Sequence, residues 1–288
     1  MNKKKIMLLS VVLTFSLLTA CGNNSNIAVE ENHTSGHEAS QSDASSAEHS
    51  GHDTAGQVES HLKASFSFDT DVTSANDETT LTIQITDHDD LPVNDFELNH
   101  EKLLHLIMVN QDLSYFNHIH PEFIGDGKFT IRTTFPVGGE YKLFADFIPT
   151  GWTSTTLSER IQVAGKEQLP MTITADKKLV KEVNGKEIEL SLSNTKPKED
   201  VTLTFNIIDA TTKQAIDNLE QYLGAVGHVV ILSEDAEQYI HVHPLDEKST
   251  CPVAQFSTSF PASGIYKLWG QFQQDGEVFT VPFVVDVK

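Results

Sequence analysis

The segment Thr80-Leu-Thr-Ile-Gln-Ile-Thr-Asp87 reappears 122 residues later as Thr202-Leu-Thr-Phe-Asn-Ile-Ile-Asp209. In both copies apolar and polar side chains alternate, which is the period of a β-strand with one face in the core. Further along, Tyr141-Lys-Leu-Phe144 returns as Tyr266-Lys-Leu-Trp269, at an offset of 125. Repetition at a nearly constant offset predicts two copies of one domain.

Short apolar strands and turns rich in Asp, Asn, Gly and Pro fill the chain past residue 62, and helical periodicity is nearly absent. The 288 residues suggest two domains. We therefore predict an all-β fold: two tandem immunoglobulin-like β-sandwich domains after a signal peptide and a disordered tether. The predicted segments are a lipoprotein signal peptide (1–20), a tether rich in His and acids (21–61), repeat 1 (62–164) and repeat 2 (165–288).

The N-terminus has the pattern of a bacterial lipoprotein signal. Lys3-Lys-Lys5 precedes an apolar run from Ile6 to Ala20, which suits a signal peptide and is short for a membrane span. The run ends in Leu18-Thr-Ala-Cys21, which looks like a lipobox, so Cys21 is the predicted lipidation site. Because several acyl chains anchor a protein stably, we expect the mature protein on the extracytoplasmic face of the cell membrane. Cys251 is then the only free thiol, which excludes an intramolecular disulfide.

The tether has the composition of a disordered segment, without Lys or Arg and with almost no large apolar residues between 22 and 60. Its histidines come in closely spaced pairs, and a flexible chain of this kind can wrap a cation without preset geometry. We expect weak, exchangeable metal capture here; the alternative is a solvated linker whose histidines have no role. The histidines concerned are His33, His37, His49 and His52.

The overall charge is strongly acidic, with 20 Lys and Arg against 41 Asp and Glu, a formal net charge of −21. Removal of the signal peptide takes away three lysines and brings the charge to −24. Such a balance argues against nucleic acid as a partner, because phosphate binding needs clusters of Lys and Arg. Two cysteines exclude a disulfide scaffold and a four-cysteine zinc site. The 13 histidines are the unusual feature.

Six of these histidines form one pattern that occurs twice. Repeat 1 has His105, His118 and His120 followed by Pro121, and repeat 2 has His228, His241 and His243 followed by Pro244. Both segments read His-x12-His-x-His-Pro, although most residues between the histidines differ. Each segment is predicted to be a β-hairpin, with turns near 111–112 and 234–235. Preservation of the spacing while the neighbours diverge indicates a shared chemical role.

A two-residue turn would place His105 directly opposite His118, with His120 on the same face two residues along. His228 and His241 would be opposed in the same way in repeat 2. Side chains opposed or diagonal on one face of a hairpin are about 5–8 Å apart at Cβ, which lets three imidazoles reach one ion. We therefore predict one metal site in each repeat; the alternative is that these histidines pack and hydrogen-bond in the interior.

Three imidazoles suit copper or zinc, and placement outside the cytoplasm favours a copper ion slightly. Candidates for a further ligand in repeat 1 are Asp146, Met108 and His100. Gln271, at the position of Asp146, and Cys251 are the candidates in repeat 2. His61 and His88 have no assigned role.

The segments around the two histidine patterns resemble a family of bacterial secreted and lipoprotein β-sandwich domains related to the YtkA-like domains. These segments are Glu101–Val109 with Asp112–Pro121, and Tyr222–His228 with Tyr239–Pro244. The resemblance covers both halves from about residue 62 and implies metal handling outside the cytoplasm. Only the six histidines carry over, since Asp146 and Gln271 differ between the repeats.

The leading hypothesis is a lipid-anchored metal-binding protein, not an enzyme, that buffers or delivers copper or zinc. Its expected partners are metal ions, the membrane and an envelope metal transporter or acceptor protein. One alternative is a structural or adhesion lipoprotein that uses its sandwiches as an interaction surface. The other is a metalloenzyme similar to copper/zinc superoxide dismutase, because of its His-x-His pair, although the further ligands of that enzyme are not found in order.

Overall fold

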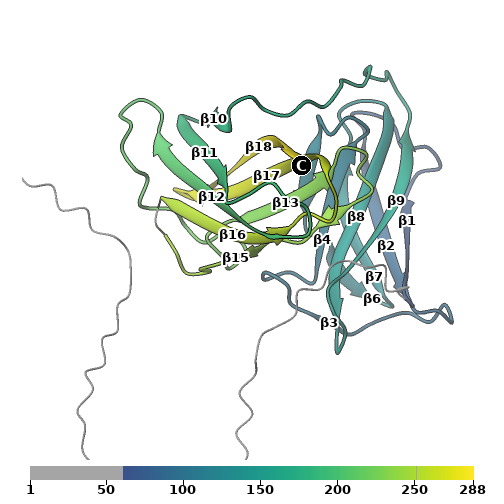
Figure 1. Ribbon diagram of the computed structural model, residues 1–288. Coiled ribbons are helices and arrows are strands. Elements are labelled where there is room, and N and C mark those ends of the chain that lie inside the picture. Colours follow the sequence, from purple (N-terminus) through teal and green to yellow (C-terminus); the bar gives the residue numbers. More distant parts are fainter. Residues whose placement is uncertain (1–60, 251) are drawn as a thin grey trace, which may run out of the picture. The chain divides into compact units, whose positions relative to one another are not determined.

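The computed structural model describes residues 61–250 and 252–288, which contain β-strands and no helix (Figure 1). The strands of repeat 1 are β1 (Lys63–Phe68), β2 (Glu78–Thr86), β3 (Phe96–Glu97), β4 (Leu104–Asn110), β5 (Phe116–Ile119), β6 (Glu122–Gly125), β7 (Lys128–Thr134), β8 (Gly139–Pro149) and β9 (Thr155–Val163). Those of repeat 2 are β10 (Val180–Val183), β11 (Lys186–Leu192), β12 (Asp200–Asp209), β13 (His228–Ser233), β14 (Tyr239–Ile240), β15 (His243–Pro244), β16 (Val253–Ser259), β17 (Gly264–Gln274) and β18 (Glu277–Val287).

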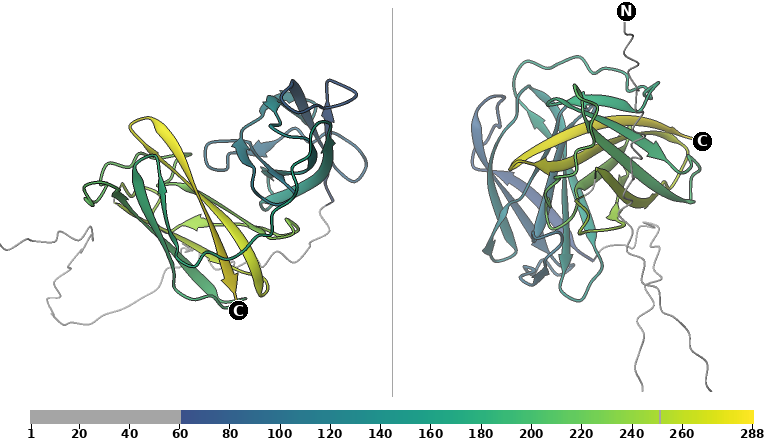
Figure 2. Two further views of the ribbon diagram at one scale, coloured as in Figure 1. Left: turned by 90° about the horizontal axis from the view of Figure 1, so that it is seen from above. Right: turned by 90° about the vertical axis from the view of Figure 1, so that its left-hand side faces the viewer.

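Each repeat consists of two antiparallel sheets. In repeat 1 the strand orders are β1-β2-β7-β6 and β3-β8-β4-β5, and β9 also pairs with β8. In repeat 2 they are β10-β11-β12-β16-β15 and β14-β13-β17-β18. Figure 2 shows the strands of each repeat from two further directions. The prediction of an all-β chain with two tandem immunoglobulin-like β-sandwiches is confirmed.

The repeated segments that predicted this fold are the central strands β2 and β12. Leu81, Ile83 and Ile85 of β2 are fully buried, and the polar residues between them lie on the outer face. Leu203, Phe205 and Ile207 follow the same pattern in β12. Burial of each such side chain stabilises the fold by roughly 1.5–3 kcal/mol. Each repeat has a core cluster of its own, and both clusters consist of described residues from Leu62 onward.

Strand β4 departs from the alternation, because Leu104 to Val109 are all buried. Its inner side chains, Leu106 and Met108, pack in the core of repeat 1. Its outer side chains, Ile107 and Val109, belong to a second apolar cluster with Val230 and Leu232 of β13. The two repeats therefore contact each other through the outer faces of β4 and β13, and both belong to one compact unit.

The register of the histidine hairpin differs from the predicted one. Ile107, not His105, lies opposite His118, and continuing the register places His105 across from His120. The loop 111–115 is longer than a two-residue turn because Leu113 takes a left-handed conformation (φ 55°) and the Asn110 side chain accepts a hydrogen bond from the Tyr115 amide. The shift is an even number of residues, so every side chain keeps its face and the three histidines still share one.

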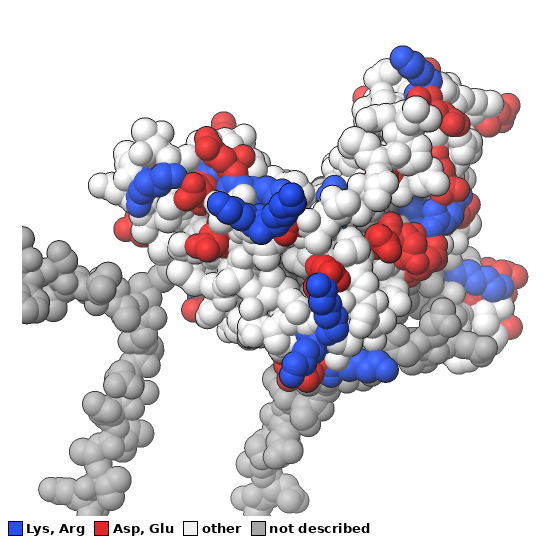
Figure 3. All heavy atoms as spheres, turned by 45° about the horizontal axis from the view of Figure 1, so that its top comes forward, with Lys and Arg blue, Asp and Glu red and all other residues white. Residues whose placement is uncertain are grey.

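The expected signal peptide, the lipidation site Cys21, the tether histidines His33, His37, His49 and His52, and the candidate Cys251 lie outside the described residues. Among residues that the structure does describe, no helix has the length and apolarity needed to cross a membrane. On the face drawn in Figure 3, Lys and Arg side chains lie beside Asp and Glu. The ion pairs of the described residues include Lys63–Asp90 and Lys213–Glu187.

Candidate metal centre

Three histidines of repeat 1 converge on the outer face of the β4–β5 hairpin. His105 is fully buried in β4, His118 is 7% exposed in β5, and His120 is half-buried just beyond β5. One ring nitrogen from each lies within 4.8 Å of the other two. A tetrahedral zinc ion with Zn–N bonds of about 2.0–2.1 Å holds its nitrogens about 3.3 Å apart. Small side-chain rotations are thus enough to bring the three nitrogens to one ion.

Hydrogen bonds fix which ring nitrogens face the centre of this cluster. His105 Nε2–H donates to the backbone carbonyl of Asn99 (2.8 Å). His118 Nδ1–H donates to Gln271 Oε1 (2.7 Å), and Gln271 is held in turn by its Nε2 donating to Thr280 Oγ1 (3.2 Å). Metal-binding histidines commonly donate their outer N–H to a carbonyl in this way, which orients the ring.

The inner nitrogens, His105 Nδ1 and His118 Nε2, are 2.9 Å apart. A neutral imidazole carries only one N–H, and in both rings that N–H is used by an outer carbonyl oxygen. The two inner nitrogens therefore both present lone pairs to each other. Either a proton or a Lewis-acid cation between them relieves this repulsion.

His120 adds a third free lone pair or N–H to the same place. Its Nε2 is buried and has no hydrogen-bond partner in the protein. Its ring centroid lies 4.9 Å from that of His105 and 4.7 Å from that of His118. Buried polar groups in native proteins are nearly always paired, so an unpaired one calls for a ligand or for another explanation.

Burial also sets the charge of these rings. It is the main cause that lowers the pKa of His105, and it lowers the pKa values of His118 and His228 well below 6.5. For His120, burial and the neighbouring His105 and Lys102 lower the pKa to about 3. The imidazoles are thus neutral at neutral pH, which is the form that binds metals, and a shared proton between His105 and His118 is disfavoured.

The second predicted triad is not brought together. Strand β14 ends at Ile240, so His241 lies just outside it, and His243 is exposed in β15, which pairs with β16 of the other sheet. Within the described residues, His105, His118 and His120 form the only group of three that could hold an ion. The prediction of one equivalent site in each repeat is therefore corrected, because in repeat 2 the chain changes sheets before its last histidine.

His228, the remaining member of the second triad, lies with the first. Its ring stacks on His105 (centroids 5.3 Å apart, planes 8° apart) and lies 4.8 Å from the ring of His118. His100 approaches the same group, 5.3 Å from His228 and 6.4 Å from His105. The cluster therefore contains five imidazoles, four from repeat 1 and one from repeat 2.

The other candidate ligands have different surroundings. The Asp146 carboxylate accepts hydrogen bonds from Ser154 (3.3 Å) and Thr156 (3.0 Å) and is not part of the three-histidine group. Met108 points into the core, where Thr133 contacts its sulfur. Gln271 acts on His118 of the other repeat, a role that was not predicted.

The backbone of residues 99–102 forms a tight turn that both supports the cluster and adds to it. Reciprocal hydrogen bonds join Asn99 and Lys102, and His100 and Glu101 both have positive φ. Such angles are costly for residues other than glycine. In repeat 2 the corresponding turn is Tyr222-Leu-Gly-Ala225, where Gly224 stands in place of Glu101 and adopts positive φ without steric cost. The two turns differ in sequence at all four positions. This difference between the repeats is the signal that could have pointed to Asn99 and His100.

The contact between the repeats is reciprocal, as in a two-fold symmetric dimer. Phe116 of repeat 1 stacks on Trp269 of repeat 2 (4.5 Å), and the equivalent pair, Tyr239 and Phe144, also meets (5.8 Å). His118 bonds to Gln271, while its counterpart His241 approaches Thr156, which holds Asp146. His105 stacks on its own counterpart, His228, as a pair on the symmetry axis would.

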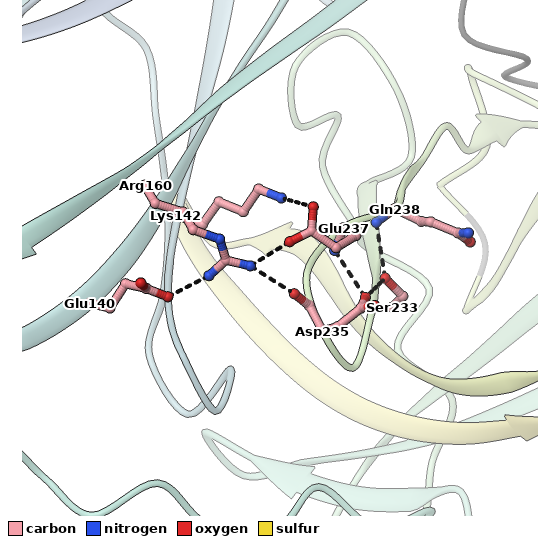
Figure 4. A network of polar contacts seen from close by, with 7 residues as sticks. All are labelled: Glu140, Lys142, Arg160, Ser233, Asp235, Glu237 and Gln238. Atoms are coloured by element: carbon pink, nitrogen blue, oxygen red, sulfur yellow. Dashed lines mark hydrogen bonds and ion pairs between the residues drawn. The ribbon is translucent and has the colours of Figure 1, made fainter.

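Charged side chains close the edge of this contact (Figure 4). Lys142 and Arg160 of repeat 1 both bind the carboxylate of Glu237, with Nζ of Lys142 at 2.8 Å. Arg160 also reaches the backbone carbonyl of Asp235 and the side chain of Glu140. On the opposite edge Lys267, the counterpart of Lys142, donates to the carbonyl of Leu113 (2.6 Å). Both lysines thus bind the hairpin loop of the other repeat.

A protein-family model described as "Domain of unknown function (DUF8832)" matches the chain twice, over residues 58–164 and 181–288. The chain belongs to this family. The two DUF8832 domains coincide with the two sandwiches, and the segment between them contains only the first residue of β10, Val180. No curated protein matches the chain.

Several solved structures are similar at a low level. The Escherichia coli adhesin FdeC is 18% identical, with 78% of this chain and 64% of that chain covered and a TM-score of 0.27. The Yersinia pseudotuberculosis adhesin InvE is 12% identical (80% and 61% covered, TM-score 0.26). A Salmonella alpha-2-macroglobulin is 10% identical (78% and 14% covered, TM-score 0.28). The chain spans less than two thirds of each of these structures, and likeness at this level does not bear on function.

Proposed function

We propose that this DUF8832 protein binds a transition-metal cation through His105, His118 and His120. The observation that carries the proposal is the pair of facing ring nitrogens, His105 Nδ1 and His118 Nε2, 2.9 Å apart with their N–H groups turned outward. The unpaired Nε2 of His120 beside them supports it. A cation accepts all three lone pairs at once, which no single proton can do.

The donor set favours borderline metals. Neutral imidazole suits zinc, copper and nickel, and the general order of affinities places Cu²⁺ first. We expect Cu²⁺ to bind most tightly and Zn²⁺ to bind in its absence. With the predicted lipoprotein signal of residues 1–21, the protein would buffer or deliver the ion at the outer face of the membrane, to a transporter or acceptor protein, rather than catalyse a reaction.

The test is a titration of the chain from residue 62 onward, which carries both sandwich cores but not the tether histidines. Isothermal titration with Cu²⁺ and Zn²⁺, with elemental analysis and EPR of the copper form, should show one tightly bound ion per chain. The variant with His118→Ala and His120→Ala should lose it. Absence of binding by the unsubstituted protein would refute the proposal.

A second candidate function is adhesion or structural support. It is favoured by large exposed apolar side chains at one end of repeat 1, where Leu98 follows β3 and Trp152 lies in the β8–β9 loop. A hydrogen bond from the Gly151 amide to Glu97 joins the two segments. In this case the histidine variants would keep partner binding, and cells carrying them would show no change in metal sensitivity.

A further inference from the structure

We infer that His228 supplies a fourth ligand, so that one cation is shared by both repeats and joins them. The inference rests on the proposed metal binding at His105, His118 and His120. It adds that repeat 2 completes this site of repeat 1. It replaces two separate sites by one site at the contact between the sandwiches.

The position of His228 carries the first step. It is the first residue of β13, and its ring contacts those of His105 and His118. In the β13–β17 pairing, His228 lies opposite Gln271, the residue whose side chain accepts the outer N–H of His118. Repeat 2 therefore supplies two adjacent groups to the cluster, an imidazole at its centre and an amide oxygen outside it.

The surroundings of His228 carry the second step. Gly227 precedes it, and a side chain there would come within 2.6 Å of the Phe272 ring, so the backbone lies tight against β17. Val229, the next residue, is packed in the core of repeat 2. His228 thus projects from a rigid strand start rather than from a loop, as a preorganised ligand requires.

The chemistry carries the third step. Three imidazoles leave an open position on a tetrahedral ion, whereas four close it. Closed four-coordinate sites are typical of structural metals rather than catalytic ones. A fourth imidazole therefore favours holding the ion over catalysis. It also makes the bound ion a cross-link, because all four ligands can reach the ion only when the repeats are in contact.

The experiment compares His228→Ala with His241→Ala in the chain from residue 62 onward. We expect His228→Ala to weaken Cu²⁺ and Zn²⁺ binding at least about tenfold. Even the loss of a residue that only hydrogen-bonds to a metal ligand typically lowers affinity by about that factor. His241→Ala, at the equivalent of His118 in the other repeat, should bind as the parent does. Pulsed EPR of the copper form should report four bound imidazoles in the parent and three in His228→Ala.

Hydrogen exchange supplies a second readout. Metal should slow exchange of the β13 amides of Val229 and Val230 as well as those of β4 in the parent, and only those of β4 in His228→Ala. His228→Gln, which keeps the polarity and much of the volume, guards against loss of folding and should behave like His228→Ala. If His228→Ala binds metal as tightly as the parent, and the parent shows only three bound imidazoles, the inference is overturned and the proposed function stands. No binding by the parent would overturn both.

Discussion

The two repeats carry the same three histidines at the same spacing, yet only repeat 1 gathers its own. In repeat 1, β5 continues through Ile119 and holds His118 against β4, with His120 at its end. In repeat 2, β14 ends at Ile240, and His243 pairs with Ser257 in the other sheet. Histidine spacing therefore does not determine a site by itself. The length of the strand that carries the second and third histidines decides whether their rings meet the first.

The residues beside the histidines diverge in the same direction. Gln271 offers His118 a neutral acceptor, whereas Asp146 at the equivalent position is engaged by Ser154 and Thr156. His100 faces the cluster from a strained turn, and its counterpart is Leu223. One half of the reciprocal contact gathers the imidazole cluster, whereas His241 and His243 of the other half lie outside the three-histidine group.

The largest expected difference between the repeats is in metal binding by the double variants. His118→Ala with His120→Ala should reduce affinity by more than about 100-fold, beyond the loss that outer partners cause. The matched variant, His241→Ala with His243→Ala, should keep the affinity and one ion per chain. Calorimetry and elemental analysis measure both. Two ions per chain, with one lost in each variant, would show that the repeats are equivalent.

A smaller effect should follow from the outer partners. Gln271→Ala removes the acceptor that orients His118 and should weaken metal binding about 10–100-fold. Asp146→Asn, at the same position in repeat 1, should lower the affinity less, because its carboxylate is held by Ser154 and Thr156 and acts on His105 through its charge alone. Competition with a coloured chelator measures both affinities. Equal losses would mean that the two positions act alike.

The metal-free protein should also respond to acid through repeat 1. Burial lowers the pKa of His120 to about 3 from 6.5, so the unfolded state binds more protons between these values. The free energy of unfolding should therefore fall as pH drops below about 6.5, by roughly 1 kcal/mol per pH unit for such a group. His120→Asn should reduce the dependence, which His105, His118 and His228 would still cause in part, and His243→Asn, at an exposed position, should leave it unchanged. Urea unfolding between pH 7 and 4 measures it.

The smallest effect should come from the ion pairs at the edge of the contact. Glu237→Gln removes a carboxylate that binds Lys142 and Arg160 but is itself half exposed. The exposed pair with Arg160 contributes about 0–1 kcal/mol, and its loss should shrink in high salt. The Lys142 side chain is buried, but glutamine keeps an oxygen that accepts a hydrogen bond from its Nζ, so that contact should change little. Glu140→Gln, which touches Arg160 alone, is the control. A loss of several kcal/mol for Glu237→Gln would show that charge rather than apolar packing holds the repeats together.

Much of the fold could be predicted because it depends on local periodicity. Leu81, Ile83 and Ile85 alternate with polar residues, and their recurrence in repeat 2 predicts the second sandwich. The shared face of His105, His118 and His120 was also predictable, since an even shift in register leaves every side chain on its side of the sheet. The register of β4 against β5 depends on the left-handed conformation of Leu113, and the local sequence does not predict that conformation.

The meeting of the repeats could not be predicted in the same way. Val230 and Leu232 bury Ile107 and Val109. Such a contact depends on how two surfaces fit together, whereas the periodicity of a strand shows only which of its own faces is apolar. The place of His228 beside His105 and the bond from His118 to Gln271 follow from that contact. The early end of β14 was likewise hidden, because His241-Val-His243-Pro continues the same alternation as His118-Ile-His120-Pro.

The segment between the sandwiches, residues 164–179, gives the shared cluster one last property. It is fastened at both ends: the Gly138 amide donates to the Lys166 carbonyl in repeat 1, and the Asp176 amide donates to the Val284 carbonyl in repeat 2. Covalent joining makes the encounter of two surfaces unimolecular, at an effective concentration in the millimolar range for short linkers. A pair of separate chains with the same faces would come apart on dilution. Here His228 stays within reach of His105 however dilute the protein is.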